Sequence, residues 1–396
     1  MIKVKKRIDY LLKHNMLIYN LISSVLNFFL FVLGHFVKIK ENLVLINSYS
    51  GLRYNDSPKA IFEYLISCEE YKHLHIVWAF ESPDKFDIPC DKVKIDSIRY
   101  FLLALQAKYW ISNVNIERGL RFKKKQTVYL NTWHGTPLKY IGSAVRHRKF
   151  DFSNIDIFCC TGEYDREIYI RDFNVKPQNI LKSGLPRNDK LYSILNAPKK
   201  EELILRKKKI LNIPINRKVI LYAPTWRDSK DSGNSYDIAL PVDFRVWERE
   251  LGDEYVILFR AHSFTTNVVN IAFNDFLIDC SSDNYDLNDL LQVSDILISD
   301  YSSIIFDFSI LEKPIICFAY DYEHYKNDRG LYIDLKKEFS DAVCYSQKEV
   351  LQKIKNLDYL EECARAKRFK EHYLYANNNA TELCVNSLFK KYKNND

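Results

Sequence analysis

The chain has 396 residues, with 58 Lys and Arg against 51 Asp and Glu, so its formal net charge is +7. Hydrophobic residues make up 47% and charged residues 28%, which is ordinary for a globular protein and excludes a disordered or fibrous one. The length predicts two domains. Because the net charge is modest and the basic clusters lack an RNP-like aromatic pattern, nucleic-acid binding is not expected.

The nine cysteines are odd in number, and no two of them have CxxC spacing. Most lie in apolar runs such as residues 157–160 and 315–318. This pattern predicts buried thiols in a reducing compartment rather than a disulfide framework or a zinc site. We therefore expect the folded part of the chain to face the cytosol.

The amino-terminal segment, residues 1–40, is basic at first and then uncharged. Five basic residues lie among the first 13, and residues 14–37 contain no Lys, Arg, Asp or Glu. Apolar residues recur there at helical spacing with polar ones between them, which favours a membrane-associating helix that lies among the lipid headgroups. A transmembrane helix would fit the length but not the polar interruptions, a signal peptide would need a cleavage site, and a buried core helix is the remaining alternative. We expect peripheral attachment to the cytoplasmic face of the cell membrane.

In chain order, short apolar runs alternate with helical patterns, which predicts parallel sheets covered by helices. The strands expected in the first half are Leu43–Asn47, Leu74–Ala79, Tyr109–Ser112, Thr127–Asn131 and Ile157–Cys160, with helices at Pro58–Ser67 and Ile98–Gln106. The strands expected in the second half are Lys218–Ala223, Tyr255–Arg260, Phe276–Ile278, Ile296–Ser299 and Ile315–Phe318, and helices are expected from Gln347 to Phe389. The two series predict α/β domains at residues 41–188 and 189–389, followed by a polar tail at 390–396.

Ligands of open parallel sheets bind beyond the carboxyl ends of the strands, so the polar segments that follow the strands are the candidate site. Residues 131–139 read Asn-Thr-Trp-His-Gly-Thr-Pro-Leu-Lys. Thr136 before Pro137 predicts the start of a helix whose N–H groups would face a phosphate. His134 beside it can take or give a proton, although an isolated histidine more often only hydrogen-bonds within a turn.

Four further segments follow in order: Ser183–Asp189, Tyr222–Asp228, Phe259–His262 and Asp295–Asp307. The guanidinium of Arg187 suits a phosphate, and an Arg and a His at the end of a buried strand are costly unless they are paired or face a cleft. Ser302 and Ser303 would open a helix. We expect Asp300 and Asp307 to position neighbouring side chains or to accept from ribose hydroxyls.

No single segment is specific, but together they predict a cleft for a phosphorylated nucleotide donor. The chain contains no GxxxxGK[ST], GxGxxG or HExxH motif, which disfavours a P-loop NTPase, a dinucleotide dehydrogenase and a zincin. Neither a metal nor a cofactor is expected.

In their order and in their amino-acid sequences, these segments resemble the CDP-glycerol glycerophosphotransferases, which are the teichoic-acid primases and polymerases of the bacterial cell envelope. The resemblance spans about residues 43–340. It implies a GT-B architecture, in which two Rossmann-like domains hold the donor in the cleft between them. It also implies that a polyol phosphate is transferred from CDP-glycerol, or a related CDP-polyol, to a lipid-linked acceptor such as an undecaprenyl-diphosphate-linked saccharide.

The transfer that the resemblance implies needs a general base, for which His134 is the first choice, and His262 is the other catalytic candidate, so the sequence leaves open which of the two is the base. The donor-binding positions that it implies are Gly135, Thr136, Pro137, Leu138, Arg187, Pro224, Thr225, Arg260, Ala261, Ser302, Ser303 and Asp307, and the supporting positions are Lys139, Arg227 and Asp300. The short amino-terminal segment departs from the long polymerases, which leaves the acceptor open. Two alternatives remain: a GT-B glycosyltransferase that uses a nucleotide-sugar, and a non-catalytic membrane-bound scaffold of the same fold.

Overall fold

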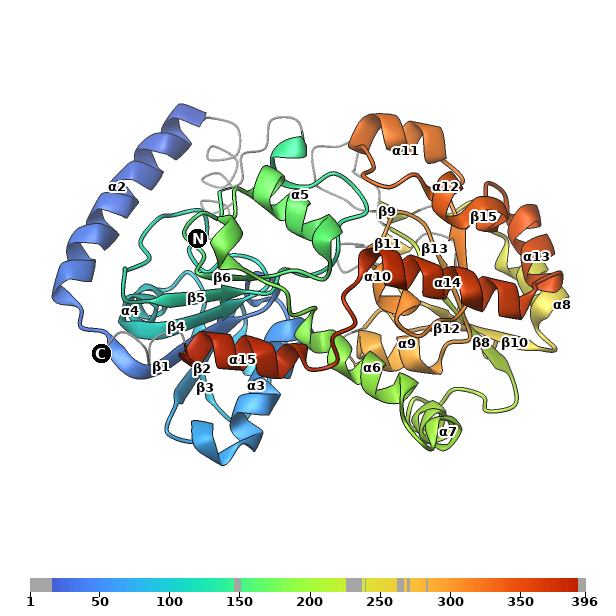
Figure 1. Cartoon of the computed structure of the whole chain (residues 1–396), viewed down its shortest axis with the longest axis horizontal. Coiled ribbons are helices and arrows are strands. Elements are labelled where there is room, and N and C mark those ends of the chain that lie inside the picture. Colours follow the sequence, from blue (N-terminus) through green and yellow to red (C-terminus); the bar gives the residue numbers. More distant parts are fainter. Residues whose placement is uncertain are drawn as a thin grey trace. The chain divides into compact units, whose positions relative to one another are not determined.

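The computed structural model describes residues 16–145, 151–225, 237–238, 240–261, 267–268, 271–282 and 284–390. These residues form two compact units, each built on a parallel sheet (Figure 1). The first unit comprises the described residues up to Trp133, residues 154–158, and those from Cys384 onward. The second unit comprises the other described residues between His134 and Leu383. The expected α/β class is confirmed.

Most strands of the first sheet closely match the expected apolar runs, whereas the short strands at Asp91–Lys94 and Ile180–Leu181 were not expected. The strands are β1 (Lys40–Asn47), β2 (His75–Phe80), β3 (Asp91–Lys94), β4 (Ala107–Ser112), β5 (Val128–Asn131), β6 (Ile157–Cys159) and β7 (Ile180–Leu181). Their order is β3-β2-β1-β4-β5-β6-β7, and the pairings from β3 to β6 are parallel. Val44 in the central strand β1 pairs with Ile76 on one side and with Tyr109 on the other.

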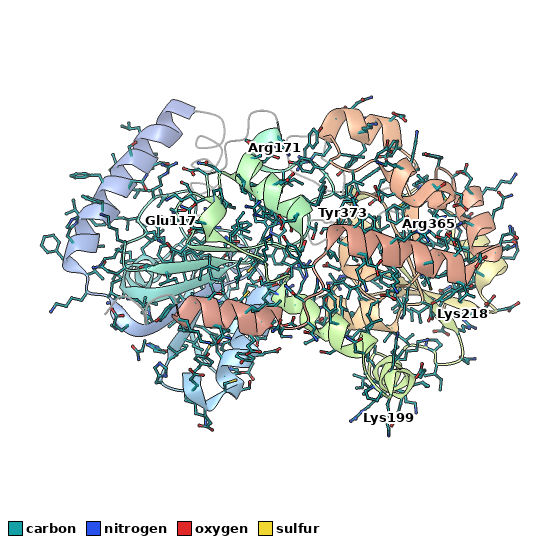
Figure 2. The ribbon with its side chains drawn as sticks, viewed as in Figure 1. Glu117, Arg171, Lys199, Lys218, Arg365 and Tyr373 are labelled. Carbon is teal, nitrogen blue, oxygen red and sulfur yellow. The ribbon has the colours of Figure 1, made fainter. Side chains whose placement is uncertain are left out.

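Helices α3 (Asp56–Ser67) and α4 (Ile98–Gln106) follow strands of this sheet. Ser97 caps α4 by accepting from the N–H of Tyr100, which explains where that helix begins. Beyond β4, the buried carboxylate of Glu117 (Figure 2) accepts from the N–H groups of Phe122 and Lys123, and burial raises its pKa.

The second sheet is built from β8 (Lys218–Ala223), β10 (Tyr255–Phe259), β12 (Leu277–Asp279), β13 (Ile296–Ser299), β14 (Ile315–Phe318) and β15 (Val343–Cys344). All of its pairings are parallel, in the order β12-β10-β8-β13-β14-β15. Two short strands, β9 (Asp237–Ile238) and β11 (Asn267–Val268), pair separately.

The described helices of the second unit are α5 (Glu163–Phe173), α6 (Asp189–Leu195), α7 (Lys200–Ile210), α8 (Phe244–Leu251), α9 (Leu287–Val293), α10 (Ile304–Ser309), α11 (Tyr322–Arg329), α12 (Leu335–Phe339), α13 (Gln347–Lys355) and α14 (Tyr359–Tyr373). The last helix, α15 (Ala380–Lys390), begins in the second unit and ends in the first.

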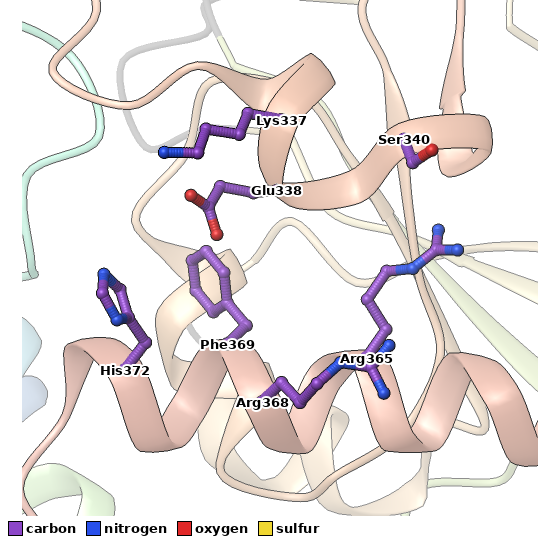
Figure 3. Close-up of a pocket in the computed structure, with 7 residues that line it drawn as sticks. All are labelled: Lys337, Glu338, Ser340, Arg365, Arg368, Phe369 and His372. Atoms are coloured by element: carbon purple, nitrogen blue, oxygen red, sulfur yellow. The ribbon is translucent and has the colours of Figure 1, made fainter.

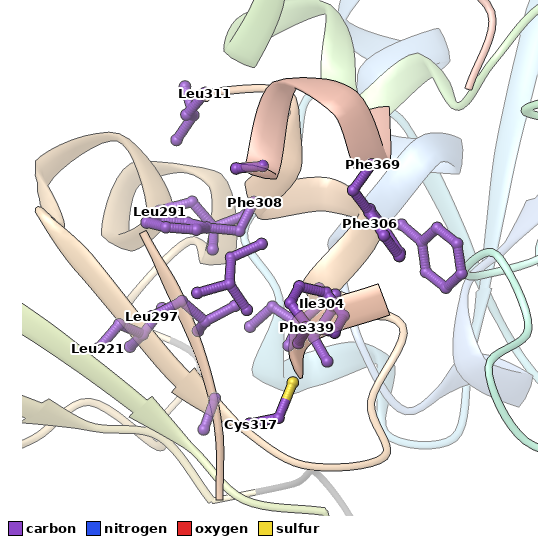
Figure 4. Packing of buried hydrophobic residues seen from close by; sticks show 14 of the residues in the cluster. Leu221, Leu291, Leu297, Ile304, Phe306, Phe308, Leu311, Cys317, Phe339 and Phe369 are labelled. Carbon is purple, nitrogen blue, oxygen red and sulfur yellow. The ribbon is translucent and has the colours of Figure 1, made fainter. Parts of the chain in front are cut away.

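Strand β8 is buried on both faces, which is typical of a central parallel strand. Val219 and Leu221 belong to the hydrophobic cluster on one face, shown in Figure 4, whereas Ile220 and Tyr222 belong to the cluster on the other. Every residue of β8 after Lys218 is therefore buried. Burial on both faces explains why the strand reads as a continuous apolar run in the sequence.

Helix α2 (Met16–Phe36) contacts the rest of the first unit at a few residues and leaves most of its described large apolar side chains exposed. Leu30 is buried, Gly34 faces Leu105, and the side-chain oxygen of Asn27 accepts from the N–H of Arg121. The large side chains of α2 that are exposed are Leu21, Ile22, Val25, Leu26, Phe28, Phe29, Phe31, Val32 and Phe36. Among the described residues, no helix has both the length and the apolarity that crossing a membrane requires.

Candidate functional site

All of the predicted site residues that the structure describes lie in the second unit. Three groups of them directly follow the carboxyl ends of the neighbouring strands β8, β10 and β13: Pro224 and Thr225, Arg260 and Ala261, and Asp300 with Ser302 and Ser303. His262 and Arg227, which the sequence also predicted, lie outside the described residues. Three adjacent strands thus bring polar side chains to one edge of the sheet, where ligands of such sheets bind.

Arg187 and Asp307 form a buried ion pair in this region. The Nη2 atom of Arg187 donates to Oδ2 of Asp307 over 2.7 Å, and the side-chain amide of Asn188 donates to Oδ1 of the same carboxylate, also over 2.7 Å. Arg187 is 8% exposed and Asp307 2%. Both oxygens of the carboxylate are therefore engaged, which offsets the cost of burying two charges.

The same guanidinium reaches the segment that contains His134. Its Nη1 atom donates to the carbonyl oxygen of His134 over 3.1 Å. Gly135 has a φ of +150°, and a Cβ atom there would lie 2.4 Å from Oγ of Ser303, so only glycine fits. Three of the predicted segments, those with His134, Arg187 and Asp307, are therefore in contact.

The His134 side chain is half-buried, whereas Trp133 and Gly135 on either side of it are buried. An imidazole that reaches solvent from an otherwise buried segment can exchange a proton with a ligand. Of the two predicted catalytic histidines, His134 is the one that lies among the described residues.

Residues 134–137, the His134 turn, are also held by side chains of α5 and of the residues just before it. The hydroxyl of Tyr169 donates to the carbonyl of Gly135 over 3.3 Å, and that of Tyr164 donates to the carbonyl of Pro137 over 2.7 Å. The hydroxyls of Thr136 and Thr161 are 2.7 Å apart. No local motif in the sequence pointed to Thr161, Tyr164 or Tyr169, because their contacts with the turn arise only in the folded chain.

The helix predicted to begin at Pro137 is not formed, and that prediction is wrong. Lys139 instead makes an antiparallel bridge with Leu331. The N–H of Tyr332 donates to the carbonyl of Leu138 over 2.9 Å, and the N–H of Tyr140 donates to that of Gly330 over 3.0 Å. Because a distant segment pairs with these backbone groups, the chain stays extended where local signals favoured a helix.

The remaining predicted residues are anchored by their neighbours. Asp300 accepts from the N–H of Thr225 over 2.8 Å, so the ends of β8 and β13 are tied together. The Nη1 atom of Arg260 donates to the carbonyls of Cys280 and Tyr285 over 2.8 and 3.1 Å. These contacts fix the loops that follow β8, β10 and β13.

The predicted helix start at the Ser302–Ser303 pair is confirmed. Helix α10 begins at Ile304, whose N–H donates to Oγ of Ser302 over 3.3 Å. In the described part of the chain, no three His, Cys, Asp or Glu side chains are grouped so that they could hold a metal ion.

A separate cavity of about 510 Å³ opens beside α12 and α14 (Figure 3) and contains none of the predicted site residues. Two arginines line it, but each is already paired: Arg365 with Asp341 over 2.7 Å and Arg368 with Glu361 over 2.8 Å. These ion pairs neutralise much of the positive charge around the cavity.

Comparison with known proteins connects this geometry to one family. The family described as CDP-glycerol:poly(glycerophosphate) glycerophosphotransferase matches residues 28–390. The chain is 33% identical to the teichoic acid glycerol-phosphate transferase of Staphylococcus aureus, over 88% of this chain and 93% of that protein. It is 30% identical to the teichoic acid glycerol-phosphate primase of Bacillus subtilis, over 86% of this chain and 90% of the primase.

The teichoic acid poly(glycerol phosphate) polymerase of Staphylococcus epidermidis is 33% identical over 89% of this chain, but the match spans only 51% of that polymerase. The chain thus covers about half the length of this relative.

Solved structures agree with the sequence matches. A structure of the wall teichoic acid polymerase TagF, in a histidine-to-asparagine variant soaked with CDPG, has a TM-score of 0.79 and 32% identity, and 90% of each chain is covered. A UDP-GlcNAc 2-epimerase from Neisseria meningitidis, with a TM-score of 0.51 and 11% identity over 88% of this chain and 99% of the epimerase, shares the fold alone. The family and the class of enzyme predicted from the ordered segments are confirmed. The chain belongs to the CDP-glycerol:poly(glycerophosphate) glycerophosphotransferase family.

Proposed function

We propose that this chain transfers glycerol phosphate, or a related polyol phosphate, from CDP-glycerol or a related CDP-polyol to a lipid-linked acceptor in teichoic acid synthesis. Family membership and the CDPG-soaked TagF structure support the donor. The observation in this chain that carries the proposal is the contact among three predicted segments, in which Arg187 joins the His134 carbonyl to Asp307. The GT-B cleft, with acceptor residues 41–188 and donor residues 189–389, remains part of this proposal.

The reaction breaks one bond of the donor diphosphate. An acceptor hydroxyl attacks the β-phosphorus of CDP-glycerol, a new oxygen–phosphorus bond forms, and the bond to the oxygen of the α-phosphate breaks, so that CMP leaves. An alcohol is a weak nucleophile until a base removes its proton. In the proposal, the half-buried imidazole of His134 takes that proton.

Negative charge on the departing CMP and on the diphosphate needs stabilisation in the transition state. Arg260, Ser302 and Ser303, at the carboxyl ends of β10 and β13, are the proposed contacts for these oxygens, and Thr225 follows the neighbouring strand β8. His262 and Arg227, which lie outside the described residues, keep the roles that the sequence predicted for them. Arg187 is already in contact with Asp307 and with the His134 carbonyl, so we assign it to holding the His134 turn as well as to the donor.

A membrane surface is the proposed location of the reaction, because a lipid-linked acceptor lies there. Helix α2 supports this assignment. Phe28, Phe31 and Phe36 are 70%, 62% and 81% exposed, and six other large apolar side chains of the same helix are exposed beside them. Isolated exposed apolar residues are common on soluble proteins, but a contiguous group on one helix marks an interaction surface.

The chemistry around α2 favours lipid over a protein partner. The helix has no Lys, Arg, Asp or Glu of its own. The backbone N–H of Arg121 donates to the side chain of Asn27 in the helix, and Nζ of Lys124 donates to the carbonyl of Val37, which directly follows it. An apolar helix beside basic residues suits an interface with anionic lipid. We therefore propose that the chain binds the cytoplasmic face of the cell membrane peripherally through α2.

The test is to measure CMP or UDP release by the purified chain with CDP-glycerol, CDP-ribitol and UDP-sugars, each with a synthetic lipid-linked disaccharide. Release of CMP with transfer to the disaccharide is expected. Release of UDP alone would show a nucleotide-sugar transferase, and binding of CDP-glycerol without release of CMP would show a non-catalytic scaffold.

A further inference from the structure

The His134 turn is fixed by more side chains than an exposed loop needs. The carbonyls of its first, second and last residues each accept from a side chain, namely from Arg187, Tyr169 and Tyr164. Its remaining residue, Thr136, is 1% exposed and contacts Thr161 through its hydroxyl. Every residue of the turn is therefore held by a side chain from elsewhere in the second unit.

Hydrogen-bond polarity shows which way the Thr136 hydroxyl points. The hydroxyl of Thr161 donates to Oδ2 of Asp165 over 2.7 Å. A threonine hydroxyl has one proton, so Thr161 can only accept from Thr136. Thr136 must then donate to Thr161, and its proton is not available for a phosphate. Although Thr136 lies in a predicted donor-binding segment, its hydroxyl acts inside the protein.

Asp165 anchors this chain of hydroxyls from the first turn of α5. Its carboxylate also accepts from the N–H groups of Thr161 and Gly162, and it is fully buried. A Cβ atom at Gly162 would lie 1.9 Å from the carbonyl oxygen of Tyr373, so this end of α5 packs tightly against the end of α14. The anchor is thus set in a part of the second unit with little room to shift.

We propose that Thr161, Tyr164 and Tyr169 are positioning residues, which fix the backbone of the His134 turn and thereby the direction of the His134 imidazole. The proposal rests on the proposed function, in which that imidazole is the general base. Misplacement of a catalytic group by about 1 Å can cost about 100-fold in rate, so a turn held at every residue has a catalytic use. A purely structural role would lower thermal stability without affecting the imidazole.

The test compares Tyr164→Phe and Tyr169→Phe, singly and together, with Tyr100→Phe. Tyr100 is a matched control because it is buried, as Tyr169 is, and its hydroxyl donates to a backbone carbonyl, that of Ile116, in the first unit. The first readout is the His134 Cε1–H signal in a ¹H–¹³C NMR spectrum of the full chain, identified by its loss in His134→Gln. We expect one sharp signal in the wild type and in Tyr100→Phe, and a shifted or broadened one in the double variant.

The second readout is kinetic. We expect kcat of the double variant to fall about 10- to 100-fold with little change in KM for CDP-glycerol, because the turn and not the donor is affected. Thr161→Val should have the same effect, and Thr161→Ser, which keeps the hydroxyl, should restore most of kcat.

An unchanged His134 signal in a folded double variant would overturn the inference. A melting temperature lowered to the same extent in Thr161→Val and Thr161→Ser, with equal kcat, would also overturn it. If the wild-type chain does not turn over CDP-glycerol, the proposed function fails, while the NMR comparison still decides whether these side chains orient His134.

Discussion

Arg187 and Asp307 are 120 residues apart in the chain, yet their side chains meet over 2.7 Å in a buried ion pair that also reaches the His134 carbonyl. Arg187 lies in the short 3₁₀ helix Pro186–Asn188, and Asp307 lies on α10 after the central strand β13. The pair therefore connects three segments that are far apart in sequence. Its integrity should matter both for stability and for the geometry of the His134 turn.

Asp307→Ala should lower the free energy of unfolding by about 3–5 kcal/mol, because Arg187 would be left as a buried charge without its carboxylate partner. Asp96→Ala is the control, since Asp96 pairs with Arg118 over 3.0 Å in a more exposed position. That change should cost at most about 1 kcal/mol. Thermal and urea unfolding measure both, and equal losses would show that the buried pair has no special role.

His134→Gln should reduce turnover of CDP-glycerol by about 100- to 10,000-fold, which is the usual contribution of a general base. The fold should persist, because the imidazole is only half-buried and the contacts described for the turn use its backbone. The control is His75→Gln, which changes a histidine that forms an exposed pair with Asp91 in the first unit. If His134→Gln keeps near-normal turnover, another group is the base.

The rate should also depend on the ionisation of Asp165. Burial raises the pKa of this carboxyl to about 6, and only its ionised form accepts fully from Thr161 and holds the hydroxyl chain in the direction described. Hydrogen bonds from Thr161, Gly162 and Tyr169 favour its ionised form, but burial outweighs them, and the other titratable groups that interact with it, Cys160, Tyr164 and Tyr375, carry no positive charge. We expect kcat to rise with pH through about 6.

Asp165→Asn should remove this rise, so that the acid side of the log kcat profile becomes shallower, and it should lower the plateau. Glu117→Gln is the matched control, since burial also raises the pKa of Glu117. An unchanged slope in Asp165→Asn would remove Asp165 from the mechanism.

Stability should respond to pH in the opposite direction. The pKa of Asp165 in the folded chain, about 6, lies above its usual value of 3.8, so the folded state binds more protons between these values. The contribution of Asp165 to the free energy of unfolding should therefore fall as pH rises through this window. In urea unfolding, the free energy of unfolding of the wild type should fall relative to that of Asp165→Asn as pH rises from about 4 to 6. A relative rise over the same range would contradict a pKa raised by burial.

Replacing Phe28 and Phe36 by serine should weaken binding to anionic vesicles. Burial of a phenylalanine side chain contributes about 1.5–3 kcal/mol, so each replacement should cost roughly tenfold or more in partitioning. Leu360→Ser is the control, because Leu360 is as exposed, at 82%, but lies on α14 of the second unit. Vesicle flotation measures the binding, and equal effects of the two changes would rule out α2 as the lipid-binding surface.

A peripheral helix also predicts how the full chain leaves natural membranes. High salt should release it only in part, because salt screens charge but does not oppose apolar burial. Alkaline carbonate should release it fully, whereas a chain that stays in the membrane after carbonate treatment would contradict peripheral attachment.

The strands of the second sheet were the easiest elements to predict. The bounds expected for β8, β13 and β14 are those observed, because strands buried on both faces read as unbroken apolar runs. Short edge strands were missed. Asp91–Lys94, which forms β3, has only one buried residue and gives almost no apolar signal.

The site was predictable as a set of segments but not as a set of contacts. Local signals placed Ser302 at a helix start correctly, yet at Pro137 they predicted a helix that the distant pairing of Lys139 with Leu331 prevents. The role of Tyr169 could not be predicted either, since a tyrosine on a helix shows nothing in sequence of the carbonyl to which it donates.

The most direct test of the account is an incubation of the purified full chain with CDP-glycerol and a synthetic lipid-linked disaccharide on anionic vesicles, followed by mass spectrometry of the lipid product. The account predicts that CMP is released, that the disaccharide gains glycerol phosphate, and that His134→Gln loses both while Tyr100→Phe keeps both. A product of unchanged mass from a folded wild-type chain that binds CDP-glycerol, or equal product from the His134→Gln variant, would contradict it.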